Sequence, residues 1–134
     1  MRSQSGPMAG TTVVFQRILR EVPVGTVIPK PEAKSDRTKR RGKRRGRPAI
    51  IYTIPNQRNA DRPFEKGVND LELQRAYDEL LASGQFTRQW FNENLPLCRD
   101  EGGCNFTTIG GLFTLLGEAY YARPGTYKRK SDGD

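Results

Sequence analysis

The chain has 134 residues, of which 34% are apolar, and this composition suits one domain with one modest core. No apolar run approaches the roughly 20 residues of a membrane-spanning helix, and the absence of histidine excludes Ser-His-Asp and Cys-His catalysis, His-based nucleases and His-ligated metal. The net charge is +8, from 23 Lys and Arg against 15 Asp and Glu, and residues 30–48 alone hold ten basic and two acidic side chains.

The first half of the chain is predicted to form a helix and a β-hairpin. Apolar residues at helical spacing predict a helix over residues 11–22, ended by Pro23. Residues 25–28 and 49–54 are rich in branched side chains and predict two short strands. Residues 30–48 then form the long tip of the hairpin, and we expect this basic arm to be mobile without a ligand because like charges repel and apolar surface is scarce. Two other segments are expected to be irregular, a flexible leader at residues 1–10 and a linker at 55–67.

The second half of the chain is predicted to be mainly helical. Asn69 or Asp70 is expected to cap a helix that ends near Leu81, and Thr87 to cap a second helix that ends before Pro96. A loop leads to a third helix over residues 107–117. The expected core residues are Leu73, Tyr77, Leu80, Phe86, Trp90, Phe91, Ile109, Leu112, Phe113 and Leu116. A type II turn at Arg123-Pro124-Gly125-Thr126 predicts a C-terminal hairpin, followed by a tail at residues 131–134.

These elements predict an α+β fold, a small and mainly helical domain of three to four helices with two β-hairpins. The single domain is expected to span residues 11–130. It would consist of a helix plus hairpin with the basic arm (11–54) and a helical unit with the C-terminal hairpin (68–130). Three helices followed by a small basic hairpin resemble a winged-helix or helix-turn-helix DNA-binding unit.

The basic arm contains Arg44-Arg45-Gly46-Arg47-Pro48, which resembles the core of an AT-hook. That resemblance implies insertion into the narrow minor groove of A·T-rich DNA, with glycine allowing close approach of the backbone. Phosphate or RNA contact without sequence preference and a charged solubilising loop are the alternatives. The candidate nucleic-acid-binding residues of the arm are Lys39, Arg40, Arg41, Lys43, Arg44, Arg45, Gly46 and Arg47.

The winged-helix resemblance implies that the helix over residues 107–117 is a recognition helix. Its solvent face would then carry Thr107, Thr108, Gly110, Gly111, Thr114 and Glu118, of which Thr107 and Thr108 are the candidate contacts. Two features depart from the pattern. The link from Pro96 to Phe106 is longer than the usual turn of three to four residues, and residues 68–134 are net acidic, with seven basic and ten acidic side chains.

A second basic and aromatic patch is predicted in the C-terminal hairpin. Its members are Tyr120, Tyr121, Arg123, Tyr127, Lys128, Arg129 and Lys130, of which Arg123, Lys128 and Arg129 are candidate nucleic-acid contacts. Tyrosine stacks on unpaired bases while Lys and Arg hold phosphates. The alternative is a hairpin whose tyrosines pack on the helices.

An enzyme is the minority interpretation. Glu32-Ala33-Lys34 after a predicted strand resembles half of a restriction-type nuclease site, which needs an upstream acid to share Mg²⁺. Glu21, on a predicted helix, is the only acid upstream of Glu32. Cys98 and Cys104 are too few for a four-ligand zinc site and are expected to be free thiols. We therefore expect no catalysis, no metal and no cofactor.

The charge pattern favours a nucleic-acid-binding protein, with DNA binding of regulatory or architectural type first and RNA or ribonucleoprotein binding second. A protein-interaction module that meets an acidic partner is a third class. Affinity would come from phosphate contacts by the basic arm. We expect a cytoplasmic protein without membrane contact, nucleoid-associated if bacterial. The sequence leaves the oligomeric state open, a homodimer included.

Overall fold

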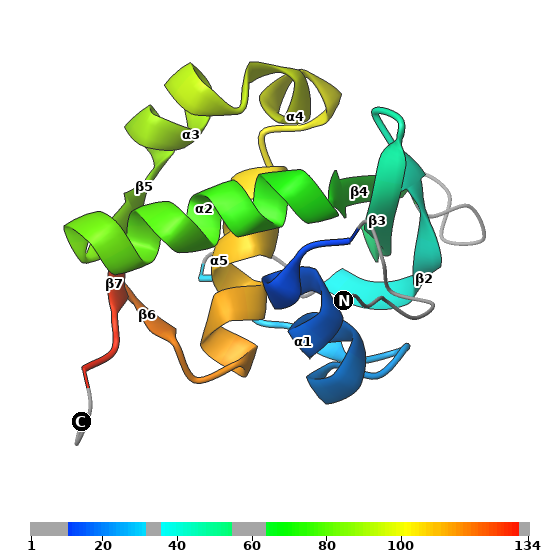
Figure 1. The fold of residues 1–134 in the computed structure, drawn as a ribbon, viewed down its shortest axis with the longest axis horizontal. Helices are drawn as coiled ribbons and strands as arrows, with labels where there is room; N and C mark the ends of the chain where they lie inside the picture. Colours follow the sequence, from blue (N-terminus) through cyan, green and yellow to red (C-terminus); the bar gives the residue numbers. More distant parts are fainter. Residues whose placement is uncertain (1–10, 32–35, 55–63, 132–134) are drawn as a thin grey trace, which may run out of the picture.

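The computed structural model describes residues 11–31, 36–54 and 64–131, which form five helices and seven strands around two antiparallel sheets (Figure 1). The helices are α1 (Val13–Glu21), α2 (Asp70–Ser83), α3 (Arg88–Asn94), α4 (Pro96–Glu101) and α5 (Asn105–Leu115). The strands are β1 (Val27–Ile28), β2 (Asp36–Arg44), β3 (Arg47–Ile54), β4 (Phe64–Asn69), β5 (Gln85–Thr87), β6 (Ala119–Arg123) and β7 (Thr126–Arg129). The α+β class is confirmed, but strands contribute more than two hairpins. The expected leader and residues 132–134 of the tail lie outside the described residues.

The first sheet has the strand order β1-β2-β3-β4 and contains most of the basic arm. Seven residue pairs join β2 to β3, from Arg37 opposite Thr53 to Arg44 opposite Arg47. The expectation of a long irregular tip is therefore wrong, because the turn contains only Arg45 and Gly46, although residues 32–35 of the arm lie outside the described ranges. Strand β2 is nine residues long, and at roughly 3.3 Å per residue it extends about 30 Å.

Two glycines explain how a strand of arginines packs on its neighbours. Ile51 on β3 is fully buried, although it faces away from the main core. A Cβ added at Gly42 would lie 2.8 Å from Cγ1 of Ile51, and one added at Gly67 would lie 2.7 Å from Cγ of Arg44. The aliphatic part of Arg44 thus crosses the sheet where Gly67 has no side chain and helps to cover Ile51.

The expected linker at residues 55–67 is wrong at its C-terminal end, since β4 begins at Phe64 and pairs with β3 along its length; residues 55–63 are not described. The next prediction is confirmed. Asn69 caps α2 in a capping box with Glu72, in which each side chain bonds to the backbone N–H of the other residue. Gly84 ends the helix in the left-handed conformation, with φ +83°.

The region between α2 and α5 holds more structure than expected. Thr87 caps α3 by accepting a hydrogen bond from the backbone N–H of Trp90, as predicted. The residues before it form β5, and α4 occupies the expected loop, beginning with Pro96 at its first turn. Proline at that position is a helix-start signal that the sequence does contain.

The second sheet has the order β5-β7-β6, so β5 pairs with the last strand of the predicted C-terminal hairpin. Arg123 lies opposite Thr126, and the turn between them is Pro124-Gly125. Gly125 has φ +77°, the value that a type II turn requires at its third position. The predicted hairpin is confirmed.

One buried cluster draws residues from α1, both sheets and α2 to α5, and α5 lies at its centre with α2 across it (Figure 1). Phe86, Phe106 and Tyr127 pack their rings together there, with centroids 4.9 to 6.5 Å apart. The core prediction is confirmed for eight of its ten members, while Tyr77 and Trp90 are partly buried against it. Among the described residues, no helix combines the length and apolar character that crossing a bilayer would need.

Candidate nucleic-acid interface

The exposed cations of the first sheet lie on β2. Arg37, Lys39, Arg40, Arg41 and Lys43 all have exposed side chains. Glu65 on β4 forms an ion pair with Lys39, and its Oε1 lies 3.6 Å from Nη2 of Arg40. The hydrogen bond from Lys39 lowers the pKa of Glu65. Burial opposes this shift, while attraction to Lys39, Arg40 and Arg44 adds to it. The side-chain cations of Arg41 and Lys43 have no hydrogen-bond or ion-pair partner among the described residues.

The cations at the tip of this hairpin, Arg44, Arg45 and Arg47, form ion pairs within the protein. Nε of Arg45 lies 2.5 Å from Oε2 of Glu72, and Nη1 lies 2.6 Å from Oε1 of Glu101. Its Nη2 also donates to the carbonyl of Gly67 at 2.9 Å. Burial alone would lower the pKa of Arg45, but these hydrogen bonds outweigh it and raise the pKa above its ordinary value. Arg45 therefore joins the hairpin tip to α2 and α4.

The flanking arginines are paired as well. Nε of Arg44 lies 2.9 Å from Glu101, and Nε and Nη2 of Arg47 contact the two carboxylate oxygens of Asp70 at 2.6 and 2.9 Å. The carboxylate of Asp70 is fully buried and also accepts a hydrogen bond from the backbone N–H of Thr12. The acidic residues that neutralise this tip come from the net-acidic second half of the chain.

The AT-hook-like core is a tight turn and not an extended segment. Arg45 and Gly46 have φ +54° and +79°, the left-handed values of a two-residue type I′ hairpin loop. A Cβ added at Gly46 would meet nothing within 4 Å, so the backbone conformation, and no close approach, requires glycine there. Insertion of Arg44, Arg45 and Arg47 into a minor groove would require their ion pairs to break, and it stays a prediction.

The expected solvent face of the recognition helix is wrong. Thr108 is fully buried, and Thr107 is half-buried. Gly110 and Gly111 lie against Tyr127 and Ile28, since a Cβ at either position would fall within 2.6 Å of those side chains. The small residues of α5 thus permit tight packing against β1 and β7, and Thr107 and Thr108 are not offered to a ligand.

Lys30, expected to belong to the mobile arm, is instead buried, and its contacts account for the burial of Thr107 and Thr108. Nζ of Lys30 donates to Oγ1 of Thr107 at 2.8 Å and of Thr108 at 2.7 Å, and it lies 3.1 Å from Asp36. Burial lowers the pKa of Lys30 and raises that of Asp36, while the attraction between them opposes both shifts. This cluster fixes the start of the arm on α5, and nothing in its local sequence separates Lys30 from the exposed cations that follow.

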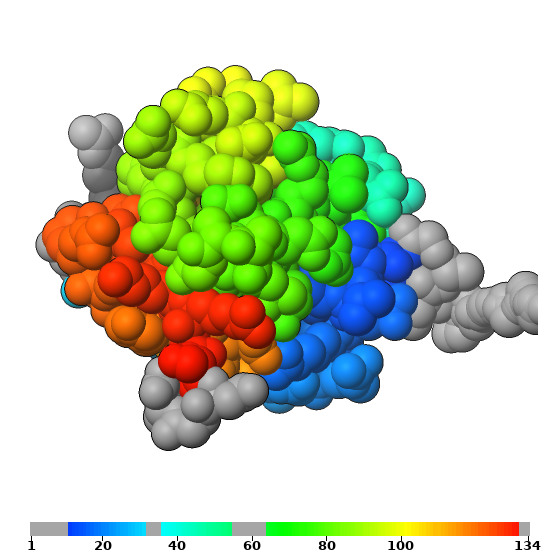
Figure 2. All heavy atoms as spheres, turned by 60° about the vertical axis from the view of Figure 1, so that its left-hand side comes forward, coloured from blue at the N-terminus to red at the C-terminus, as the bar shows by residue number. Residues whose placement is uncertain are grey.

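In the second basic patch the charged side chains are exposed or half-buried, but one of the three predicted tyrosines is buried. Tyr127 is buried, with its ring 5.5 Å from that of Tyr121. Tyr120 remains 46% exposed and lies opposite the half-buried Lys128 on the neighbouring strand. The side chains of Arg123, Arg129 and Lys130 are exposed. Figure 2 shows the C-terminal residues, in red, at the surface beside α2 and separated by it from the first hairpin, in cyan.

The fragmentary nuclease pattern is not assembled in the described residues. Glu32 and Lys34 lie outside them, and Glu21 is paired with Arg17 at 2.8 Å on α1. Cys98 is a buried free thiol whose pKa burial raises, and Cys104 is a half-buried free thiol. In comparisons with protein-family models, curated proteins and solved structures, no match to this chain is found.

Proposed function

We propose that the protein binds nucleic acid through the exposed cations of β2, with duplex DNA as the preferred ligand. The observation that carries this proposal is a single strand with five exposed basic side chains, two of which have no partner among the described residues. An unpaired surface cation neutralises a phosphate without breaking an internal ion pair, so each contact releases condensed counterions and adds affinity.

The shape of the strand supports the same proposal. β1 pairs with β2 only at Asp36 and Arg37, so no described strand covers the outer edge of β2 from Lys39 to Arg44. A row of cations on an open edge prevents pairing with a second copy of the strand. The same row suits a polyanion that runs along the edge, and contacts of this kind position a protein on DNA without reading its sequence.

We propose that the second half of the chain has a winged-helix arrangement, but that this arrangement does not supply the surface that contacts nucleic acid. Helix α2, strand β5, helices α3 to α5 and the hairpin β6–β7 follow one another, and β7 pairs with β5. That order resembles a winged-helix unit with one additional helix. Docking through α5 is not part of the proposal, because Ile28 and Lys30 cover the face that would enter a groove.

RNA with unpaired bases is the second candidate ligand. The observation that favours it is the exposed ring of Tyr120 opposite Lys128 on the C-terminal hairpin. An aromatic face beside a cation suits one stacked base and its phosphate. A strong preference for single-stranded or structured RNA, lost in Tyr120→Ala, would favour this ligand over duplex DNA.

Fluorescence-anisotropy titrations at several salt concentrations test the proposal. The ligands are A·T-rich and G·C-rich duplexes, single-stranded DNA and structured RNA. The double variant Arg41→Ala and Lys43→Ala should lower the slope of log K against log salt by about two units on every duplex. Arg75→Ala removes one exposed charge from α2 and should leave the slope unchanged. No binding by the wild type at near-physiological salt would refute the proposal and favour a protein-interaction module.

A further inference from the structure

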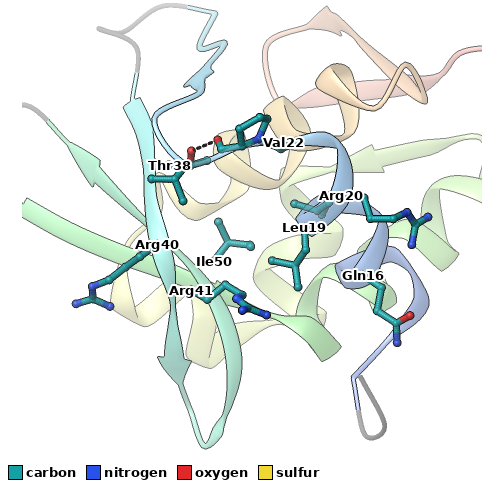
Figure 3. A pocket seen from close by; sticks show the side chains of 11 residues that line it. Gln16, Leu19, Arg20, Val22, Thr38, Arg40, Arg41 and Ile50 are labelled. Carbon is teal, nitrogen blue, oxygen red and sulfur yellow. Dashed lines mark hydrogen bonds between the residues drawn. The ribbon is translucent and has the colours of Figure 1, made fainter. Parts of the chain in front are cut away.

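A pocket of about 440 Å³ opens between α1 and the strands β2 and β3, beside the proposed nucleic-acid surface (Figure 3). Its floor is apolar: Ile50 and Val22 are buried, and Leu19 is partly buried against the core. Val24 at its rim is 70% exposed. A cavity of this volume and apolar character is in the size range of small-molecule sites, which typically measure about 300–1,000 Å³.

One cation points into this apolar space. Arg41 lies opposite Ile50 in the register of β2 and β3, so the two side chains share a face of the sheet. Figure 3 shows Arg41 extending beneath Ile50 toward Leu19, whereas Arg40 extends to the other side of the strand, where Glu65 lies 3.6 Å away. Arg20 also lines the pocket but points away from it in this view.

Two uncharged polar side chains, Gln16 and Thr38, also line the pocket, and both are already paired. Nε2 of Gln16 donates to Oγ1 of Thr11 at 3.1 Å. The hydroxyl of Thr38 donates to the carbonyl of Pro23 at 2.8 Å and accepts the backbone N–H of Thr26 at 3.0 Å. Arg41 has no such partner among the described residues. A ligand that fills the pocket therefore has one polar requirement, an acceptor for the guanidinium, and carboxylates meet it with two parallel hydrogen bonds.

We propose that this pocket binds a small amphipathic carboxylate, with the acid group on Arg41 and an alkyl or aryl body of about ten non-hydrogen atoms over Leu19, Val22 and Ile50. Charge complementarity decides the class of ligand, since an amine would be repelled by Arg41 and a neutral alcohol would lack the charge-assisted bond. An acidic amphipathic peptide offers the same groups on a larger body and is a competing occupant.

Arg41 belongs both to this pocket and to the proposed nucleic-acid surface. A bound carboxylate would neutralise it and lower nucleic-acid affinity, so the ligand would act as an effector. That consequence rests on the proposed function, but binding of the carboxylate does not. Octanoate binding is measured without nucleic acid, so its failure is distinct from failure of the proposed function.

Calorimetric titrations of the full chain with octanoate, octanol and octylamine test the pocket. Octanoate should bind at least tenfold more tightly than octanol, and octylamine should show no binding. Amide chemical shifts should change around Leu19, Arg41 and Ile50. Arg41→Ala should weaken octanoate binding at least tenfold. Lys43→Ala removes a cation from the same face of β2 but outside the pocket, and it should leave octanoate affinity within about twofold.

Three results would overturn the proposal. The first is equal binding of octanoate and octylamine, and the second is unchanged octanoate affinity in Arg41→Ala with the thermal stability of the wild type. The third is no octanoate binding at millimolar concentration, in particular if an acidic amphipathic peptide shifts the same amides. Amide spectra of Arg41→Ala establish that the variant is folded, so that a loss of binding is due to the missing guanidinium.

Discussion

Two basic hairpins, β2–β3 and β6–β7, lie at opposite ends of α2 and are held to the protein in different ways (Figure 1). The tip of the first is fixed by ion pairs from Arg44, Arg45 and Arg47 to three carboxylates. The second is fixed by a buried aromatic ring, Tyr127, and its cations remain at the surface. The basic residues at the tip of the first hairpin thus form a structural joint, a set of ion pairs that connects the hairpin to α2 and α4. The basic residues of the second hairpin face solvent.

The comparison shows that positive charge in a sequence is not the same as positive charge at a surface. Residues 30–48 hold the whole net charge of the chain, yet Arg45, Arg47 and Lys30 are partnered by Glu72, Asp70 and Asp36. The net-acidic second half, which by itself opposes docking on DNA, supplies Asp70, Glu72 and Glu101, the carboxylates that pair with the tip. The exposed charge that remains is concentrated on β2.

Replacement of Arg45 should produce the largest effect. Arg45→Ala leaves Glu72 without its cation and Glu101 with Arg44 alone, in a partly buried site where the two carboxylate side chains are 10% and 19% exposed. Loss of one partner of such a pair costs on the order of 3 kcal/mol. Denaturant melts should show this loss, while Arg41→Ala, four residues earlier and exposed, should change stability by less than about 0.5 kcal/mol. Equal, small effects of both changes would mean that the tip is not a structural joint.

The same joint should make the first hairpin sensitive to acid. Burial opposes ionisation of Glu101, but hydrogen bonds from Arg45 and Arg44 outweigh it and lower its pKa below the ordinary 4.5. The folded state then binds fewer protons than the unfolded state, so Glu101 contributes stability above pH 4.5 that is lost as the pH falls through its folded pKa.

Thermal melts between about pH 6 and 3 provide the measurement. The stability of the wild type should fall more steeply with acid than that of Glu101→Gln, which has no carboxylate to protonate at this position. Glu93→Gln on α3 is a matched control, since Glu93 is exposed and its carboxylate accepts a hydrogen bond from Gln89 and pairs with no cation among the described residues. Parallel curves for the wild type and Glu101→Gln would contradict the assignment.

Within the first hairpin, paired and unpaired cations should affect nucleic-acid binding differently. Lys43→Gln removes an unpaired charge and should lower the salt slope by about one unit. Arg47→Gln removes a charge already paired with Asp70 and should leave the slope nearly unchanged. Salt-dependent anisotropy titrations of both variants separate these cases. A larger change of the salt slope for Arg47→Gln would mean that the hairpin tip contacts the nucleic acid.

The smallest effect is expected in the second hairpin. The hydroxyl of Tyr127 is buried and has no hydrogen-bond partner among the described residues, and burial raises its pKa to about 12. Tyr127→Phe removes this unsatisfied group and should raise stability by about 0.5–1 kcal/mol. The matched change Tyr52→Phe removes a hydroxyl that donates to Asn105 and should lower stability instead. Denaturant melts of the two variants should therefore shift in opposite directions.

Features set by neighbours in the sequence were predictable. Asn69, Thr87 and Gly84 act on backbone groups within four residues, and the Pro124-Gly125 turn depends on its own two dihedral preferences. Helices α2 and α3 and the C-terminal hairpin followed from these signals, whereas α4 was expected to be a loop. Arg45-Gly46 contains the same kind of signal, a glycine at a two-residue turn, but the dense charge around it favoured an irregular arm.

Features set by partners distant in the sequence were not predictable, and they decide what the basic segment does. Arg45 meets Glu72 and Glu101 across 27 and 56 positions, and Lys30 meets Thr108 across 78. Repulsion within the segment is a local property that the sequence determines alone. Whether that repulsion is neutralised depends on which carboxylates the fold brings within about 3 Å, since ion pairs act only at short range in a partly buried site. The sequence by itself thus determined an α+β protein with an excess of positive charge, and only the tertiary structure decided which of those charges face solvent.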